Sequence, residues 1–199
     1  MSQAATASEG HPSLYSATGV ASNKLGMWVF LASEVMFFTG LLAAYIVLRM
    51  GHPAWPGSEG HLSVPMGTLN TFVLICSSMT IVMALAALHD GKIGVVRRWL
   101  LATVGLGSLF LVIKGIEYSA KFSHHIFPSS SIFWSCYFTL TGFHALHVLG
   151  GIIFNLWVWQ LTFKTAVWER RSHFLELAGL YWHFVDIVWI FLFPLLYLL

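Results

Sequence analysis

The run Leu25-Gly-Met-Trp-Val-Phe-Leu-Ala-Ser-Glu-Val-Met-Phe-Phe-Thr-Gly-Leu-Leu-Ala-Ala-Tyr-Ile-Val-Leu48 is long and apolar, yet it holds an acid, Glu34, closer to its middle than to either end. A helix of roughly 20 apolar residues crosses the hydrocarbon core of a bilayer. An ionisable side chain there costs roughly 2.5 kcal/mol or more unless it is protonated, paired or turned to a polar cavity. Glu34 is therefore the first candidate functional residue.

The composition of the chain is that of an integral membrane protein. Of its 199 residues, 57% are hydrophobic and 9% are charged, with a mean hydropathy of +0.76. Soluble domains carry about 25% charged residues. The formal charge of +2 is too small to indicate a nucleic-acid partner. Cys76 and Cys136 both fall within apolar runs, so they indicate neither a disulfide framework nor a metal motif.

Five apolar segments of membrane-spanning length follow a polar start. Residues 1–23 are rich in Ser, Ala, Thr and Gly and are expected to form a mobile tail. The segments are too long for membrane strands and do not alternate with period two, which excludes a barrel. The sequence predicts an all-α membrane domain at 24–199, a bundle of five transmembrane helices. The expected spans are about 25–48, 67–88, 98–122, 132–160 and 175–198.

The placement of basic residues predicts how the bundle is oriented. Basic residues near the ends of membrane spans are retained on the cytoplasmic side. The positions that share one predicted face are Lys24, Lys92, Arg97, Arg98, Lys164, Arg170 and Arg171, whereas the other face has Arg49 and Lys121. We therefore expect the N-terminus to be cytoplasmic and the C-terminus external.

Two pairs of polar residues inside the spans have the spacing i, i+3. They are Lys114 with Glu117, and His183 with Asp186. This spacing places both side chains of a pair on one face of a helix. Each pair could therefore neutralise itself within its own helix, and His183 and Asp186 should face protein or a polar cavity rather than lipid.

His144 and His147 lie near the middle of the fourth span and leave three interpretations open. Two histidines of one helix cannot ligate one haem iron from opposite sides, although either could do so together with His183. A non-haem metal would need further ligands, which Glu34 and Asp186 could supply. The third interpretation is structural, because histidines form hydrogen bonds between membrane helices where glycines such as Gly142, Gly150 and Gly151 permit close approach.

Three runs of the sequence resemble subunit III of the haem-copper cytochrome c oxidases. They are Trp28-Val-Phe-Leu-Ala-Ser-Glu-Val-Met-Phe-Phe38, Thr141-Gly-Phe-His-Ala-Leu-His-Val-Leu-Gly-Gly151 and Tyr181-Trp-His-Phe-Val-Asp-Ile-Val-Trp-Ile-Phe191. They occur in the order of the family, and the resemblance extends over about residues 24–199. Glu34 matches the buried acid of the family. His144, His147, His183 and Asp186 match its other intramembrane polar positions.

The resemblance implies a multi-pass subunit of a terminal respiratory oxidase in the bacterial plasma membrane, with no catalytic residue and no metal ligand of its own. In such an oxidase, oxygen reduction is coupled to proton pumping, and haem and copper belong to subunits I and II. Subunit III packs on subunit I, binds phospholipid in a cleft, and supports proton uptake and the lifetime of the active site. It has also been proposed to lie on an oxygen route.

The sequence departs from the long form of this family. That form has two further helices before the one that carries the acid, and they form one wall of the lipid cleft. This chain resembles the short, five-helix bacterial form, with either an open groove or a wall supplied by another chain. The run Ser33-Glu-Val-Met-Phe-Phe38 resembles the cytochrome c branch more than the related quinol oxidases.

Two functions of other classes remain as alternatives. One is a quinol-linked electron carrier that binds b-type haem through His144 or His147 with His183. The other is a small transporter or proton channel built around Glu34, Asp186 and the histidines. The sequence favours the latter little, because it shows neither a clear inverted repeat nor a matched pair of broken helices.

Overall fold

The computed structural model describes residues 22–53, 55, 62–164, 168 and 171–198, and within them it contains helices and no strand. Most of the polar tail predicted at 1–23 lies outside these residues. The long helices are α1 (Ser22–Gly51), α2 (Val64–His89), α3 (Ile93–Ser123), α4 (Ile132–Leu161) and α6 (His173–Phe193), and a π-helical turn (Pro194–Leu198) extends α6.

Within the described residues, five helices are long and apolar enough to cross a membrane, the last one including the π turn. Each of the five spans expected from the sequence lies inside one of them. The predicted fold class, an all-α membrane protein with five spanning helices, is confirmed. Which side of the membrane each terminus occupies stays a prediction.

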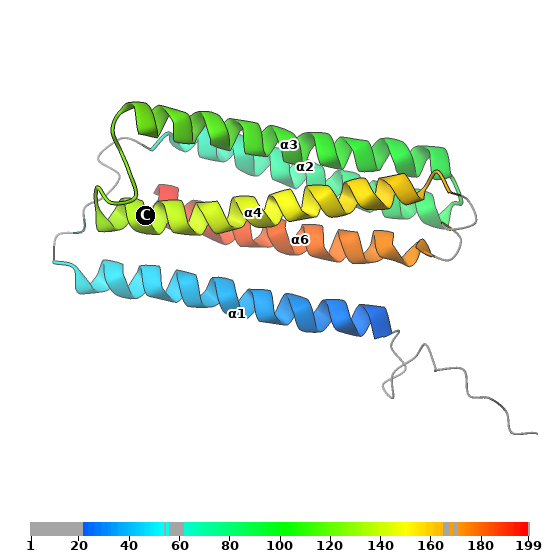
Figure 1. The fold of residues 1–199 in the computed structure, drawn as a ribbon, viewed down its shortest axis with the longest axis horizontal. Helices are drawn as coiled ribbons and strands as arrows, with labels where there is room; N and C mark the ends of the chain where they lie inside the picture. The colour runs from blue at the N-terminus through cyan, green and yellow to red at the C-terminus, as the bar shows by residue number, and fades with distance from the viewer. Residues whose placement is uncertain (1–21, 54, 56–61, 165–167, 169–170, 199) are drawn as a thin grey trace, which may run out of the picture.

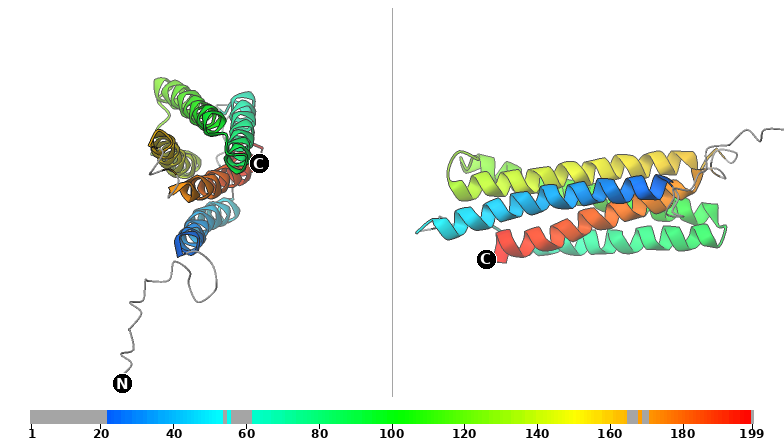
Figure 2. Two further views of the ribbon diagram at one scale, coloured as in Figure 1. Left: turned by 90° about the vertical axis from the view of Figure 1, so that its right-hand side faces the viewer. Right: turned by 90° about the horizontal axis from the view of Figure 1, so that it is seen from below.

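The helices α2, α3, α4 and α6 pack side by side, whereas α1 lies along the outside of this group (Figure 1). Seen end-on, α6 separates α1 from α2 and α3 (Figure 2). The start of α1 lies at the same end as the turn between α2 and α3 and the start of α6 (Figure 1). The C-terminus lies at the opposite end, as an odd number of spans requires.

The centre of the bundle is built around Trp182 of α6, which is fully buried. Its indole Nε1 donates to Ser77 Oγ of α2 over 3.0 Å. A Cβ atom added to Gly107 of α3 would lie 2.6 Å from the ring, and one added to Gly151 of α4 would lie 2.8 Å from it. Two glycines therefore make room for one indole, and a single side chain brings four helices together.

Of the three glycines expected to permit close approach on α4, Gly151 does so most clearly. A Cβ on Gly150 would come no nearer than 3.4 Å, to the hydroxyl of Tyr181, and one on Gly142 would have no neighbour within 4 Å. The prediction is wrong for Gly142, because no neighbouring helix comes close enough to this position for a Cβ atom to meet it.

Trp189, two turns after Trp182, fixes the other half of α6. Its Nε1 donates to Thr71 Oγ1 of α2 over 3.0 Å, and its ring packs edge-on against Phe110 of α3. Beyond it the chain widens into the π turn at Pro194, which has no N–H group to donate to a regular helix. The π turn carries Tyr197, whose hydroxyl reaches back into the bundle.

Candidate functional site

Glu34 of α1 forms a hydrogen bond with His147 of α4. Its Oε2 lies 2.9 Å from His147 Nε2. The two residues are 113 positions apart in the chain, so the bond joins the outlying helix to the bundle at the depth where an unpaired acid would cost most. Below, these two residues are called the Glu34–His147 pair.

The geometry of the pair fixes how many protons it holds. The Nδ1 atom of His147 lies 2.7 Å from the carbonyl oxygen of Phe143, which can only accept, so Nδ1 carries a hydrogen. Between Nε2 and Glu34 there is then one more proton, which belongs either to the carboxyl group or to the ring. Both forms are neutral overall, so the pair as a whole carries no net charge at this depth.

Aromatic rings surround the Glu34–His147 pair. Phe38 packs edge-on against the imidazole at 4.9 Å, and Phe37 packs edge-on against Phe143 at 5.1 Å. The side chains of Glu34 and His147 remain 20% and 18% exposed. The pair therefore lies at the rim of the contact between α1 and α4, screened on one side and open on the other.

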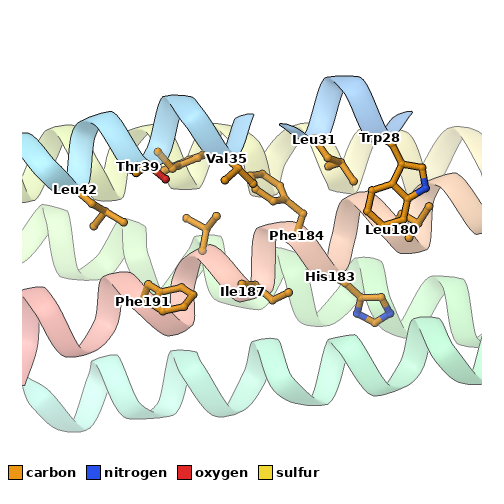
Figure 3. Close-up of a pocket in the computed structure, with 12 residues that line it drawn as sticks. Trp28, Leu31, Val35, Thr39, Leu42, Leu180, His183, Phe184, Ile187 and Phe191 are labelled. Atoms are coloured by element: carbon orange, nitrogen blue, oxygen red, sulfur yellow. The ribbon is translucent and has the colours of Figure 1, made fainter. Parts of the chain in front are cut away.

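A groove runs between α1 and α6 on the other side of Phe38. It encloses about 380 Å³ and is lined on α1 from Trp28 to Leu42 and on α6 from Leu180 to Phe191. Figure 3 shows apolar side chains along nearly its whole length, with Thr39 and His183 as the polar exceptions. This α1–α6 groove is apolar, and Phe38 is the wall that it shares with the Glu34–His147 pair.

The predicted pair of His183 with Asp186 does not form. His183 turns its Nδ1 to Ser78 Oγ of α2, 2.7 Å away. Neither carboxylate oxygen of Asp186 has a hydrogen-bond partner among the residues that the structure describes. The intrahelical prediction is wrong because a neighbouring helix offers His183 a hydroxyl. Both residues line a second groove, between α2 and α6, of about 510 Å³.

His144 does not form the interhelical hydrogen bond expected of it. It is fully buried, and neither ring nitrogen has a partner in the described part of the chain. Its ring packs against Phe110 of α3 and Trp189 of α6, at 5.6 and 5.0 Å between centroids. Of the two histidines, His147 forms the interhelical hydrogen bond that the structural interpretation expects, whereas His144 packs among aromatic rings without one in the described residues.

This geometry does not favour axial ligation of a haem by the two histidines of α4. Both ring nitrogens of His147 are engaged, one by Phe143 and one by Glu34. The ring of His144 is enclosed by aromatic side chains. Nor do Glu34 and Asp186 converge on one histidine, because Glu34 binds His147 whereas Asp186 lies on the α2–α6 groove.

Lys114 and Glu117 form the ion pair that their spacing predicts, with Lys114 Nζ 2.9 Å from Glu117 Oε2. Both side chains are almost completely buried. The pair is part of a larger group, called here the charge cluster, made of Lys114, Glu117, Lys121, Tyr137 and Tyr197. Tyr137 comes from α4 and Tyr197 from the π turn, and both hydroxyls lie within 3.0 Å of Glu117 Oε1.

Three members of the charge cluster are absent from the sequence-based candidates. The position of Lys121 near the end of a span predicts that it lies at the outer membrane face with Arg49. It is instead 4% exposed and lies 2.8 Å from Glu117 Oε1. Its spacing of i, i+4 from Glu117 is a signal that could have identified it. No local spacing identifies Tyr137 or Tyr197, because they reach Glu117 from other elements.

Comparison with known proteins assigns the chain to a family. Residues 4–199 match the family model described as cytochrome c oxidase subunit III. Cytochrome c oxidase subunit 3 of Corynebacterium diphtheriae is 38% identical over 87% of this chain and 86% of the relative, and that of Thermostichus vulcanus is 39% identical over 88% and 86%. The Synechocystis protein of the same name is 37% identical over 96% of this chain and 78% of the relative.

Two of the relatives are also similar to this chain in length. The first two alignments cover similar shares of both partners, so those relatives are close to this chain in length. The five apolar helices identify a multi-pass membrane protein. From the match over nearly its whole length, the chain belongs to the cytochrome c oxidase subunit III family.

Proposed function

We propose that this chain is a supporting subunit, without a redox centre, of a terminal respiratory oxidase in the bacterial inner membrane. It packs on subunit I, which together with subunit II holds the haem and copper, and it sustains proton uptake and the lifetime of the active site. Membership of the subunit III family supports this proposal, and so do relatives that are named cytochrome c oxidase. Those names favour cytochrome c over quinol as the electron donor.

The Glu34–His147 pair is the observation that carries the proposal. It is a neutral acid–base couple that holds one proton between its two groups and joins α1 to α4. Loss of either side chain leaves the other unpaired within the span, which is costly. In this proposal the pair keeps α1 in place, and α1 in turn keeps one wall of the α1–α6 groove in place.

The α1–α6 groove supports a lipid as the partner of this arrangement. Its walls are mainly aliphatic and aromatic, and they follow α1 and α6 side by side (Figure 3). A phospholipid chain held between α1 and α6 would transmit the position of α1 to whatever chain packs beside it. The acid would thus act indirectly, through lipid and packing, on the proton supply of a neighbouring active site.

The test is the durability of the whole oxidase during turnover. We expect complexes that carry Glu34→Ala or His147→Gln to begin with nearly normal oxygen consumption and then to lose activity several-fold faster than the parent complex. Proton uptake during turnover should fall in parallel. The measurement is oxygen consumption over successive turnovers of the purified complex in liposomes.

Glu176→Ala is the matched control. Glu176 of α6 also holds α1, through an ion pair of 2.5 Å with Lys24, but that pair lies at the helix ends, where it is partly exposed and contributes little. Its removal should leave the lifetime unchanged. An unchanged lifetime and unchanged proton uptake in both Glu34→Ala and His147→Gln would refute the proposal.

A further inference from the structure

We propose that a pocket beside the charge cluster binds a phosphate group through Lys121. The pocket encloses about 200 Å³ between the start of α2, at Ser63 and Met66, and the last turns of α3, at Glu117, Lys121 and His124. It is called here the α3-end pocket. The start of α2 and the end of α3 lie at the end of the bundle opposite to the start of α1 (Figure 1). The pocket shares no lining residue with the α1–α6 groove and contains neither Glu34 nor His147.

The charge cluster carries an excess of positive charge. It contains two ammonium groups, those of Lys114 and Lys121, and one carboxylate, that of Glu117. All three side chains are at most 5% exposed. Burial of an ammonium group without a full counter-charge is strongly unfavourable. One negative charge placed next to the cluster would remove this imbalance.

Hydrogen bonding identifies Lys121 as the ammonium group that can take a further partner. Lys114 has three donors and three acceptors around it, namely Glu117, Tyr137 and Tyr197, at 2.9, 3.3 and 2.5 Å. Lys121 also has three donors, but among the described residues it donates a hydrogen bond to Glu117 alone. Within this part of the chain two N–H groups of Lys121 therefore remain for other partners, and Lys121 lines the α3-end pocket whereas Lys114 does not.

Two aromatic rings also contact the Lys121 ammonium group. Lys121 Nζ lies 4.9 Å from the centre of the Tyr137 ring and 5.7 Å from that of Trp134. A cation–π contact is weaker than the cost of burying an ammonium group without a counter-ion. Among the described residues, Glu117 and these rings are the partners of the Lys121 ammonium group, and no second carboxylate forms an ion pair with it.

The start of α2 adds favourable potential at the same place. Ser63 is the N-cap of α2, and its side chain forms no capping hydrogen bond. The first peptide N–H groups of a helix have no partner within the helix and carry partial positive charge. Ser63 and Met66 line the pocket together with Lys121, so the positive end of α2 adds to the potential there, although Pro65 contributes no N–H group.

A phosphate group matches the pocket in charge and size. Since one water molecule occupies about 30 Å³ of liquid, the α3-end pocket has room for a phosphate and several waters. Because it lies near the end of a membrane-spanning helix, the phosphate could belong to a lipid headgroup or be free in solution. Both sources present the same oxygens to Lys121, and an experiment separates them.

The experiment uses the intact oxidase complex, depleted of lipid in mild detergent. Binding of radiolabelled inorganic phosphate is measured by equilibrium dialysis in a chloride buffer. Native mass spectrometry then counts the phosphatidylglycerol or phosphatidylcholine molecules retained after each lipid is added back. The complexes compared carry the parent chain, Lys121→Met, Ala120→Asp or Lys92→Met.

Lys121→Met should weaken phosphate binding about tenfold or more, the loss expected when a hydrogen bond to a charged group is removed. This variant should fold, because it leaves Lys114 and Glu117 as a neutral pair. Ala120→Asp places a carboxylate on the wall of the pocket and should abolish binding while Lys121 is still present. Lys92→Met removes an exposed lysine that pairs with Asp90 at the opposite end of the bundle, so it should change nothing.

Each outcome decides the matter. Inorganic phosphate that binds once per chain and depends on Lys121 indicates a site for a free anion. Retention of one phospholipid that depends on Lys121 and is not displaced by inorganic phosphate indicates a headgroup site. The proposal is overturned if the parent chain and Lys121→Met bind phosphate equally and retain the same number of lipids.

Discussion

Trp182 illustrates how much one residue contributes where four helices meet. Its indole fills the space left by Gly107 and Gly151, and its nitrogen donates to Ser77. The contact is so close that even one methyl group at either glycine would overlap the ring. A residue of ordinary appearance in the sequence therefore sets the spacing between α3, α4 and α6.

Gly151→Ala should destabilise the chain measurably. The added Cβ would lie 2.8 Å from the Trp182 ring, so the ring or a helix must shift. Overpacking of this kind costs about 1–3 kcal/mol. The measurement is the midpoint of thermal unfolding of the purified complex, followed by loss of the monodisperse peak on size exclusion.

Gly142→Ala on the same helix is the control for this prediction. It meets nothing within 4 Å, and replacing a helical glycine favours the helix by roughly 0.5–1 kcal/mol. Its midpoint should stay the same or rise slightly. Equal midpoints for the two variants would show that Trp182 moves freely and would contradict the packing described here.

The sequence predicts local pairs better than pairs between helices. Lys114 and Glu117 are one turn apart, so their ion pair follows from spacing alone. The same rule fails for His183 and Asp186, because Ser78 of α2 competes for the imidazole. The partner of Glu34 lies 113 residues away, and no spacing rule reaches across two helices.

At the scale of elements, α3 depends on partners from α4 and the π turn for its charged residues. Glu117 accepts hydrogen bonds from Lys114, Lys121, Tyr137 and Tyr197. The acid is the only negative charge within the charge cluster, so both ammonium groups depend on it. The cluster thus ties the last turns of α3 to the end of the chain.

Glu117→Gln should have a large effect on stability. The substitution leaves two buried ammonium groups without a counter-charge, and the loss of one partner of a buried ion pair costs about 3–5 kcal/mol. We expect little assembled oxidase in membranes that carry this variant. The measurement is the amount of complex recovered, together with its unfolding midpoint.

Lys121→Met provides the comparison for Glu117→Gln. It removes the excess ammonium group and leaves the Lys114–Glu117 pair intact, so the loss of stability should be clearly smaller. A recovery of Glu117→Gln as high as that of Lys121→Met would show that the carboxylate does not hold the cluster together.

The lengths of the helices follow from the sequence, whereas their mutual arrangement does not. Apolar runs bounded by polar residues predict all five spans, because a bilayer imposes a length on each of them. The outlying position of α1 depends on contacts with α4 and α6, which are far from α1 in the sequence. A further long-range contact is the hydrogen bond from the Tyr45 hydroxyl to the carbonyl oxygen of Leu195, 150 positions later in the chain. The candidate site is formed by such long-range contacts. The sequence therefore identifies Glu34 and His147 as candidates but does not predict that they bind each other.

For the whole molecule, the distribution of charge becomes more uneven than the sequence suggests. The residues Lys24, Lys92, Arg97, Arg98, Lys164 and Arg171 belong to one end of the bundle, and Arg170 lies outside the described residues. At the opposite end the sequence predicts two basic residues, Arg49 and Lys121. Lys121 is buried in the charge cluster, so of these two only Arg49 lies outside it. From the positive-inside rule we therefore predict that the Ser22 end of α1 is cytoplasmic.

This orientation can be tested by labelling single introduced cysteines. Ser129→Cys, in the connection between α3 and α4, should react with a membrane-impermeant maleimide in intact spheroplasts. Lys92→Cys, at the opposite end, should react after the membrane is opened. The parent chain, with Cys76 and Cys136 half-buried within α2 and α4, gives the background labelling. The reverse pattern would contradict the orientation.

Glu34 and His147 are 113 positions apart in the chain, so the ribosome also synthesises them at different times. A ribosome adds about 5–20 residues per second, so α1 is made on the order of ten seconds before the histidine that will receive its acid. Lys114 and Glu117, three residues apart, emerge almost together. Glu34 must therefore enter the membrane either as a neutral acid or in contact with the insertion machinery. Its hydrogen bond to His147 can form only after α4 has been synthesised.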